Sequence, residues 1–113
     1  MNGATSQLDI CKSHGSAFTP PTGDEKLGIA LSSLHLRPLN ALRHRPENGT
    51  CGWYIWGGDV LSQDPHFFEP LHVQHLASHA PELVPFLALA PGWRVLLAPE
   101  LCDIWHDPSL LEQ

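Results

Sequence analysis

Residues 51–58 read Cys-Gly-Trp-Tyr-Ile-Trp-Gly-Gly, and they are the clearest strand signal in the chain. Aromatic and β-branched side chains favour strands, and the two closing glycines are typical of a turn. Side chains alternate between the two faces of a strand, so Trp53 and Ile55 share one face while Tyr54 and Trp56 share the other. Because both faces then carry large apolar groups, we expect a central strand that is covered on both sides.

Three further segments around this strand have strand-like composition. Apolar runs at 26–31 and 93–98 are bounded by turn residues and predict buried strands, and residues 101–105 predict another. Residues 47–49, Glu-Asn-Gly, predict a turn before the central strand. The sequence therefore predicts a small, mainly antiparallel sheet.

The length of 113 residues is that of one domain. Residues 1–24 are rich in Ser, Thr, Gly and Pro and have no sustained period, so we expect a flexible N-terminal tail. We assign residues 25–113 to one α+β domain, a small mainly antiparallel sheet with one or two helices packed on it.

A helix is expected at about 70–80, ending before Pro81, although Pro70 weakens that expectation. His72, His75 and His79 have the spacing of a single helix face. Two imidazoles on one face can bind zinc if further ligands complete the site. A metal-binding module, or a metal-dependent enzyme, is therefore our alternative hypothesis, against a helix whose polar stripe happens to be histidine.

Charge is distributed unevenly along the chain. Residues 1–56 carry five basic and four acidic groups, whereas 57–113 carry only Arg94 against eight carboxylates. A net charge of −6 argues against binding nucleic acid. The acidic second half would instead attract a basic partner and speed its association.

Cysteine usage and hydropathy indicate the compartment. Cys11, Cys51 and Cys102 are odd in number and form no CxxC pair, which fits a reducing compartment. The N-terminal residues lack the pattern of a signal peptide, and no apolar run approaches the length of a membrane span. We expect a cytoplasmic protein with no membrane partner.

Catalytic signatures are absent from the sequence. It contains no GxSxG nucleophile elbow, no phosphate-binding glycine loop and no dinucleotide fingerprint. We therefore expect no enzymatic activity and no cofactor, and we look for a surface that binds a partner.

Aromatic anchors beside carboxylates are the candidates for that surface. Core packing is the usual role of Trp, but a partly exposed Trp next to acidic groups makes a good interface anchor. Trp56 and Trp105 fit this description, and carboxylates in predicted turns and element ends would steer a basic partner. The expected partner-binding residues are Trp56, Asp59, Asp64, Glu69, Glu100, Asp103, Trp105 and Asp107.

Several strings follow one another along the chain as an ordered set of aromatic, proline and glycine landmarks. They are Lys-Leu-Gly-Ile-Ala-Leu at 26–31, Arg-Pro-Leu-Asn-Ala-Leu-Arg-His at 37–44, the string at 51–58, Phe-Phe-Glu-Pro-Leu-His-Val-Gln-His-Leu at 67–76, Leu-Ala-Pro-Gly-Trp-Arg at 89–94, and Asp-Ile-Trp-His-Asp at 103–107. Together they resemble a family of small bacterial immunity proteins of polymorphic toxin systems. The resemblance covers about residues 25–111 and is specific as an ordered set.

Membership in such a family implies an α+β domain without enzymatic activity that binds a cognate toxin in the cytosol and blocks it. The shared strings look like fold determinants, so the resemblance transfers no contact residues. Many such toxins are basic nucleases, and an acidic half that mimics a phosphate surface would suit one of them. We therefore expect a basic toxin as the partner and occlusion of its active site as the mechanism.

Overall fold

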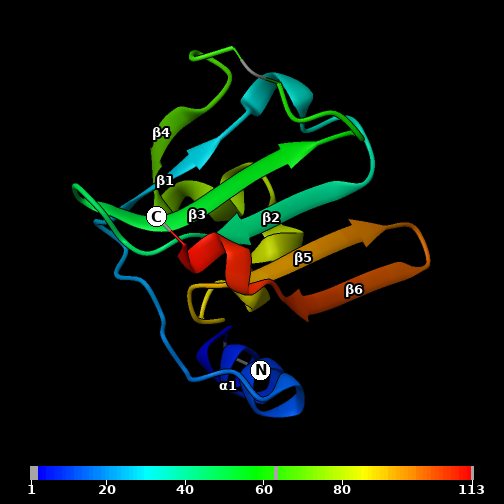
Figure 1. Cartoon of the computed structure of the whole chain (residues 1–113). Helices are drawn as coiled ribbons and strands as arrows, with labels where there is room; N and C mark the ends of the chain where they lie inside the picture. The colour runs from blue at the N-terminus through cyan, green and yellow to red at the C-terminus, as the bar shows by residue number, and fades with distance from the viewer. Residues whose placement is uncertain (1–2, 63, 113) are drawn as a thin grey trace.

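The computed structural model describes residues 3–62 and 64–112, and a six-stranded sheet organises them. The strands lie in the order β4-β1-β3-β2-β5-β6, as Figure 1 shows. Only β1 and β3 run parallel, and the other four neighbouring pairs are antiparallel. The strands are β1 (Lys26–Ile29), β2 (Leu39–Arg43), β3 (Thr50–Gly57), β4 (Glu69–His72), β5 (Trp93–Ala98) and β6 (Leu101–His106). The predicted α+β class with a mainly antiparallel sheet is confirmed.

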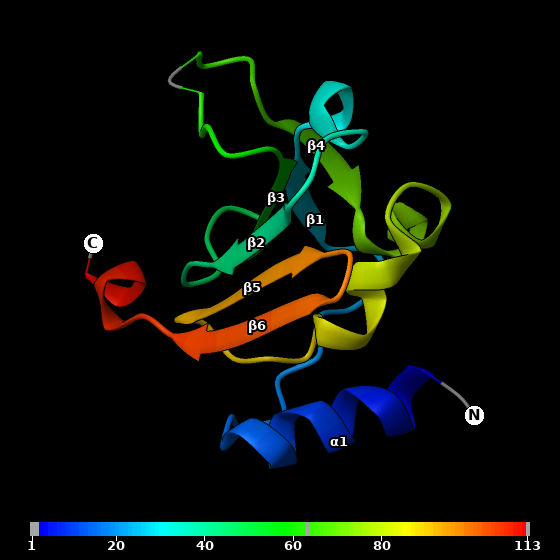
Figure 2. The same ribbon diagram turned by 90° about the vertical axis from the view of Figure 1, so that its right-hand side faces the viewer.

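Helical segments cover the two faces of the sheet unequally (Figure 2). The α-helix α1 (Gly3–His14) and the 3-10 segments η2 (Val73–Ser78) and η3 (Pro81–Phe86) supply residues to the main core on one side, which we call the helical face. The 3-10 segment η4 (Pro108–Leu111) packs Leu110 on the opposite side, against Leu42 and Trp56, and we call this side the aromatic face. A further short 3-10 segment, η1 (Leu31–Ser33), follows β1.

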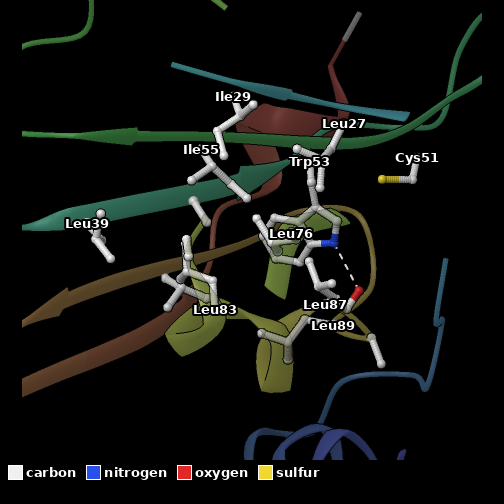
Figure 3. Packing of buried hydrophobic residues seen from close by; sticks show 14 of the residues in the cluster. Leu27, Ile29, Leu39, Cys51, Trp53, Ile55, Leu76, Leu83, Leu87 and Leu89 are labelled. Atoms are coloured by element: carbon white, nitrogen blue, oxygen red, sulfur yellow. Dashed lines mark hydrogen bonds between the residues drawn. The ribbon is translucent and has the colours of Figure 1, made fainter. Parts of the chain in front are cut away.

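The central strand is β3, as residues 51–58 predicted. Trp53 and Ile55 are fully buried in the main core, and Trp53 Nε1 donates a hydrogen bond to the carbonyl oxygen of Leu87 at 2.9 Å (Figure 3). Trp56 and Tyr54 belong to the second cluster, on the aromatic face. The alternation predicted for these four side chains is confirmed, because two separate clusters use the two faces of one strand.

The turn before β3 also follows the prediction. Asn48 and Gly49 have φ values of +53° and +84°, the left-handed pair of a two-residue hairpin turn. Glu47 and Thr50 flank it as an antiparallel bridge. The turn therefore connects β2 to β3 as a hairpin.

The helix predicted at 70–80 is wrong. Residues 69–72 form β4, an edge strand paired antiparallel to β1, and only 3-10 turns follow in η2. Pro70 lies opposite Gly28 in this pair. A proline has no N–H and is tolerated on an edge strand but not inside a helix, so the pairing with β1 outweighs the helical spacing.

The expected N-terminal tail contains helix α1. Cys11 is fully buried against the main core, and Gln7 Nε2 donates a hydrogen bond to the carbonyl oxygen of Val84 at 2.9 Å. Gln7, Leu8 and Ile10 are only partly buried. This apolar stripe is too weak to stand out as a period in the sequence, so the prediction of an irregular segment does not hold for Gly3–His14.

Arg43, at the end of β2, is buried, and none of the ion pairs found in the described part of the chain involves it. Its side chain is 2% exposed, and burial lowers the pKa of its guanidinium from the ordinary value. Nε donates to the carbonyl oxygen of Cys51, and Nη1 donates to those of Thr19, Leu87 and Leu89, at 2.7–3.2 Å. One cation thus holds three segments of the chain together beside the core.

Candidate partner-binding face

Two rows of side chains cross the aromatic face from β3 to β6. Residues directly opposite each other in an antiparallel pair place their side chains on the same face. The strand registers give the first row as Tyr54, Leu42, Arg94 and Trp105, and the second as Trp56, Asn40, Leu96 and Asp103. Trp56, Asp103 and Trp105, all predicted from sequence, therefore share one face of the sheet.

Arg94 organises the β6 end of the first row. Its guanidinium lies 5.3 Å from the centre of the Trp105 ring, and Nη1 donates a hydrogen bond to Asp107 Oδ2 at 3.1 Å. Asp107 Oδ1 accepts hydrogen bonds from the backbone N–H and the hydroxyl of Ser109. The hydroxyl of Ser109, followed by Arg94, holds the pKa of Asp107 below its ordinary value. Asp107 is therefore committed to contacts within the chain.

The predicted acidic residues form two groups. Asp59, Asp64 and Glu69 lie in the loop between β3 and β4 or at its end, and all three are exposed. Glu100 and Asp103 lie in the β5–β6 hairpin and are exposed, and Asp107 follows it. Because β4 and β6 are opposite edges of the sheet, the structure does not bring all these carboxylates together.

The two tryptophans predicted as anchors differ in exposure. Trp56 is only 5% exposed and packs in the second cluster, so the expectation of a partly exposed side chain is wrong for it. A partner on this face would therefore contact the residues beside Trp56 in the sheet more than Trp56 itself. Trp105 is partly exposed at the edge of the aromatic face, next to Asp103 and Asp107 in sequence.

An open cavity of about 530 Å³ lies on the aromatic face. Tyr54, Trp56 and Phe68 supply its aromatic lining, Leu42 and Leu61 add aliphatic surface, and the exposed Arg45 and Glu47 also border it. This volume falls in the range of ordinary ligand pockets, ~300–1,000 Å³, which are mostly apolar with a few polar groups. The alternation of side chains in the sequence places Tyr54 and Trp56 on one face but does not indicate this cavity.

Phe68 packs against the other aromatic residues of the cavity, and a glycine allows β1 to approach one of them closely. The Phe68 ring meets the rings of Tyr54 and Trp56 edge to face, with centres 5.2 and 6.1 Å apart. Gly28 lies opposite Tyr54 in the β1–β3 pair, and a Cβ there would come within 2.6 Å of the Tyr54 ring. The glycine inside a strand was the one sequence signal for this close approach.

Next to the cavity, the loop before β4 exposes apolar side chains. Val60 is 76% exposed and Leu61 is 43% exposed. Between Arg45 and Arg94 the chain has no Lys or Arg, and this loop carries Asp59 and Asp64. Exposed apolar groups rimmed by charge are typical of surfaces that contact another protein.

The three histidines do not form one helix face. His72 ends β4, His75 lies in η2, and His79 follows that segment. The rings of His72 and His75 are 6.0 Å apart between centres. Within residues 3–62 and 64–112, no three His, Cys, Asp or Glu side chains are placed to hold a metal ion. The arrangement on which the metal hypothesis depended is therefore wrong.

All three cysteines are free thiols in the structure. Burial raises the pKa of Cys11 and of Cys51, which keeps these thiols protonated and unreactive. Cys102 is exposed on β6. Among the helices in the described parts of the chain, none has the length and hydropathy needed to cross a membrane.

Comparison with known protein families places most of the chain in one of them. The model of the Imm33-like domain family matches residues 6–107, from within α1 to just beyond β6. No curated protein matches the chain, and no solved structure matches it. The matched range includes all six strands, so it covers the whole sheet and both of its faces.

Proposed function

The chain belongs to the Imm33-like domain family of immunity proteins, and from this we propose that it binds a cognate toxin in the cytoplasm and neutralises it. The family match over residues 6–107 is the observation that carries the proposal. Inhibition would follow from binding alone, without a chemical step and without a cofactor. Its stoichiometry would be one inhibitor to one toxin.

The charge of the chain supports a basic toxin. The second half carries eight carboxylates and one basic residue. Such a field accelerates the encounter with a basic protein and disfavours neutral competitors. A nuclease that holds phosphate groups with Lys and Arg is the toxin class that this surface suits best, and covering those residues would occlude its active site.

The aromatic face is our proposed contact surface. It combines an apolar cavity, the partly exposed Trp105, the exposed Asp103, and the loop with Leu61. Aromatic and apolar groups contribute most of the binding energy in an interface, while charges steer the approach. Of the two acidic groups, Glu100 and Asp103 would steer toward β6, and Asp59 and Asp64 toward the cavity.

The proposal is tested by capture followed by a toxicity assay. The tagged chain is used to retain proteins from lysate of its own source at low and at moderate salt, and the retained protein is then expressed alone and with this chain. We expect the retained protein to arrest growth when expressed alone and to be harmless together with this chain. A retained protein that is harmless by itself would contradict the proposal.

A further inference from the structure

Among residues 3–62 and 64–112, no backbone pairs with the outer edge of β6. Within this part of the chain β6 pairs with β5 alone, through six consecutive residue pairs from Trp93 and His106 to Ala98 and Leu101. β6 is the last strand on its side of the sheet. Figure 2 shows it in front of β5, with no other strand beside it. An edge of this kind is a template for a further strand.

The hydrogen-bond pattern identifies which groups point outward. The Asp107 N–H donates to the carbonyl oxygen of Gly92 at 2.7 Å, so the N–H of Asp107 points toward the segment that leads into β5. Along an antiparallel strand, successive residues direct their backbone groups alternately toward and away from the neighbouring strand. The backbone groups of Trp105, Asp103 and Leu101 therefore face β5.

The N–H and C=O groups of the intervening residues, Cys102, Ile104 and His106, therefore face outward. In the parts of the chain that the structure describes, no backbone hydrogen bond from another segment reaches them. Three alternate residues on one edge thus offer both donor and acceptor to a partner strand.

The other edge of the sheet is protected. β4 has four residues and includes Pro70, which offers no N–H. β6 has six residues and contains neither proline nor glycine. Short strands and prolines are common ways of blocking edge pairing, and β6 has neither of them. The two edges therefore differ in their capacity to accept a strand.

The charge of the residues in and next to β6 indicates which kind of partner strand could pair with it. After Arg94 the chain has no Lys or Arg, but it has Glu100, Asp103, Asp107 and Glu112. Asp103 and Trp105 project on the aromatic face, and Ile104 projects on the helical face. A partner strand would place its side chains alternately on the two faces of the sheet, beside these residues. Lys or Arg would suit the aromatic face, beside Asp103 and Trp105. An apolar residue would suit the helical face, beside Ile104.

We propose that the toxin adds a β-strand to β6, with basic residues on the aromatic face alternating with apolar residues on the helical face. This inference rests on the proposed function, because the strand is supplied by the toxin. A second copy of this chain is a poorer occupant, since each copy has a net charge of −6 and would bring the same carboxylates to the shared edge.

Amide hydrogen exchange tests the pairing without any substitution. The probe is the toxin captured and identified as described above, prepared as an inactive variant. In the complex, the amides of Cys102, Ile104 and His106 should exchange at least about tenfold more slowly than in the free chain. A complex that forms while these three amides exchange at unchanged rates would overturn strand addition and leave the immunity function intact.

A proline on the outward-facing edge gives a second test. Cys102→Pro removes an outward N–H that takes no part in the β5–β6 pairing, and should weaken toxin binding at least about tenfold. Cys102→Ala, which removes the thiol but keeps the N–H, should remain within about twofold of wild type. Thermal melting confirms that each variant is folded. Equal affinity of a folded Cys102→Pro variant and wild type would overturn the proposal. A second result would also overturn it: slower exchange of the same amides that increases with protein concentration in the absence of toxin. The strand that pairs with β6 would then come from a second copy of this chain.

Discussion

The guanidinium of Arg94 lies 5.3 Å from the centre of the Trp105 ring and 3.1 Å from a carboxylate oxygen of Asp107. Arg94 is the only basic residue in 57–113, and its charge is used within the chain. It orients Trp105 at the edge of the aromatic face and offsets Asp107, while Asp103 has no such partner among the ion pairs of the described residues. The uncompensated charge of this edge is therefore negative.

Charge reversal at Asp103 tests electrostatic steering. Asp103→Lys should slow association with the toxin about tenfold at low salt and flatten its salt dependence, because long-range attraction is lost. Asp9→Lys is the matched control, since it makes the same charge change on an exposed position of α1, across the sheet from the aromatic face. Stopped-flow association rates over a salt series give the measurement. Equal slowing by both variants would show that the net charge, and not this edge, controls the rate.

Substitution of Leu61 tests whether the cavity is part of the interface with the toxin. Leu61 lines the cavity and Val60 does not. Leu61→Ser should raise the Kd for the toxin about tenfold, from the loss of roughly 1–2 kcal/mol of apolar burial, while Val60→Ser should change it little. Calorimetric titration measures both. If the two substitutions have the same effect, the cavity is not in the interface.

Substitution of Arg43 tests how much its buried guanidinium stabilises the fold. Arg43→Met removes one donor from each of four carbonyl oxygens, although that of Leu87 still accepts from Trp53 Nε1. The substitution should lower the free energy of unfolding by about 3 kcal/mol or more. Arg45→Met, at an exposed neighbouring position, should change it by less than about 0.5 kcal/mol. Urea unfolding followed by Trp fluorescence provides both values. An Arg43→Met variant as stable as wild type would show that water or rearrangement satisfies these carbonyls.

Asp107 gives a pH-dependent prediction. The pKa of Asp107 lies below its ordinary value of 3.8, so its carboxylate stabilises the fold above pH 3.8. That contribution is lost as pH falls through the folded-state pKa. Wild type should therefore exceed Asp107→Asn in stability near neutral pH, and the difference should shrink below about pH 4. Urea unfolding from acidic to neutral pH measures it, and a difference that stays constant throughout would contradict the assignment.

Local pattern predicted the centre of the sheet. In β3, alternation of large apolar side chains identified both the strand and the two faces that it covers. β5 and β6 were also predicted within a residue of their ends. These strands are apolar or aromatic enough that their own side chains require burial, whatever pairs beside them.

Elements that depend on distant partners were not predicted. β2 looks like a basic stretch between prolines, and it is a strand because β3 and β5 pair with it on both sides. β4 has helical spacing but pairs with β1, more than forty residues earlier in the chain. The cavity has the same origin, since Leu42, Tyr54 and Phe68 meet only when β2, β3 and the loop before β4 come together.

Titration of toxin activity with this chain shows directly whether binding neutralises the toxin. The toxin captured by the chain is assayed on its own substrate while purified chain is added in increasing amounts. Neutralisation by binding predicts that activity falls linearly and reaches its minimum at about one equivalent when the complex is tight. A stoichiometric complex that retains full activity would contradict the claim and would identify the chain as a binding partner that does not inhibit.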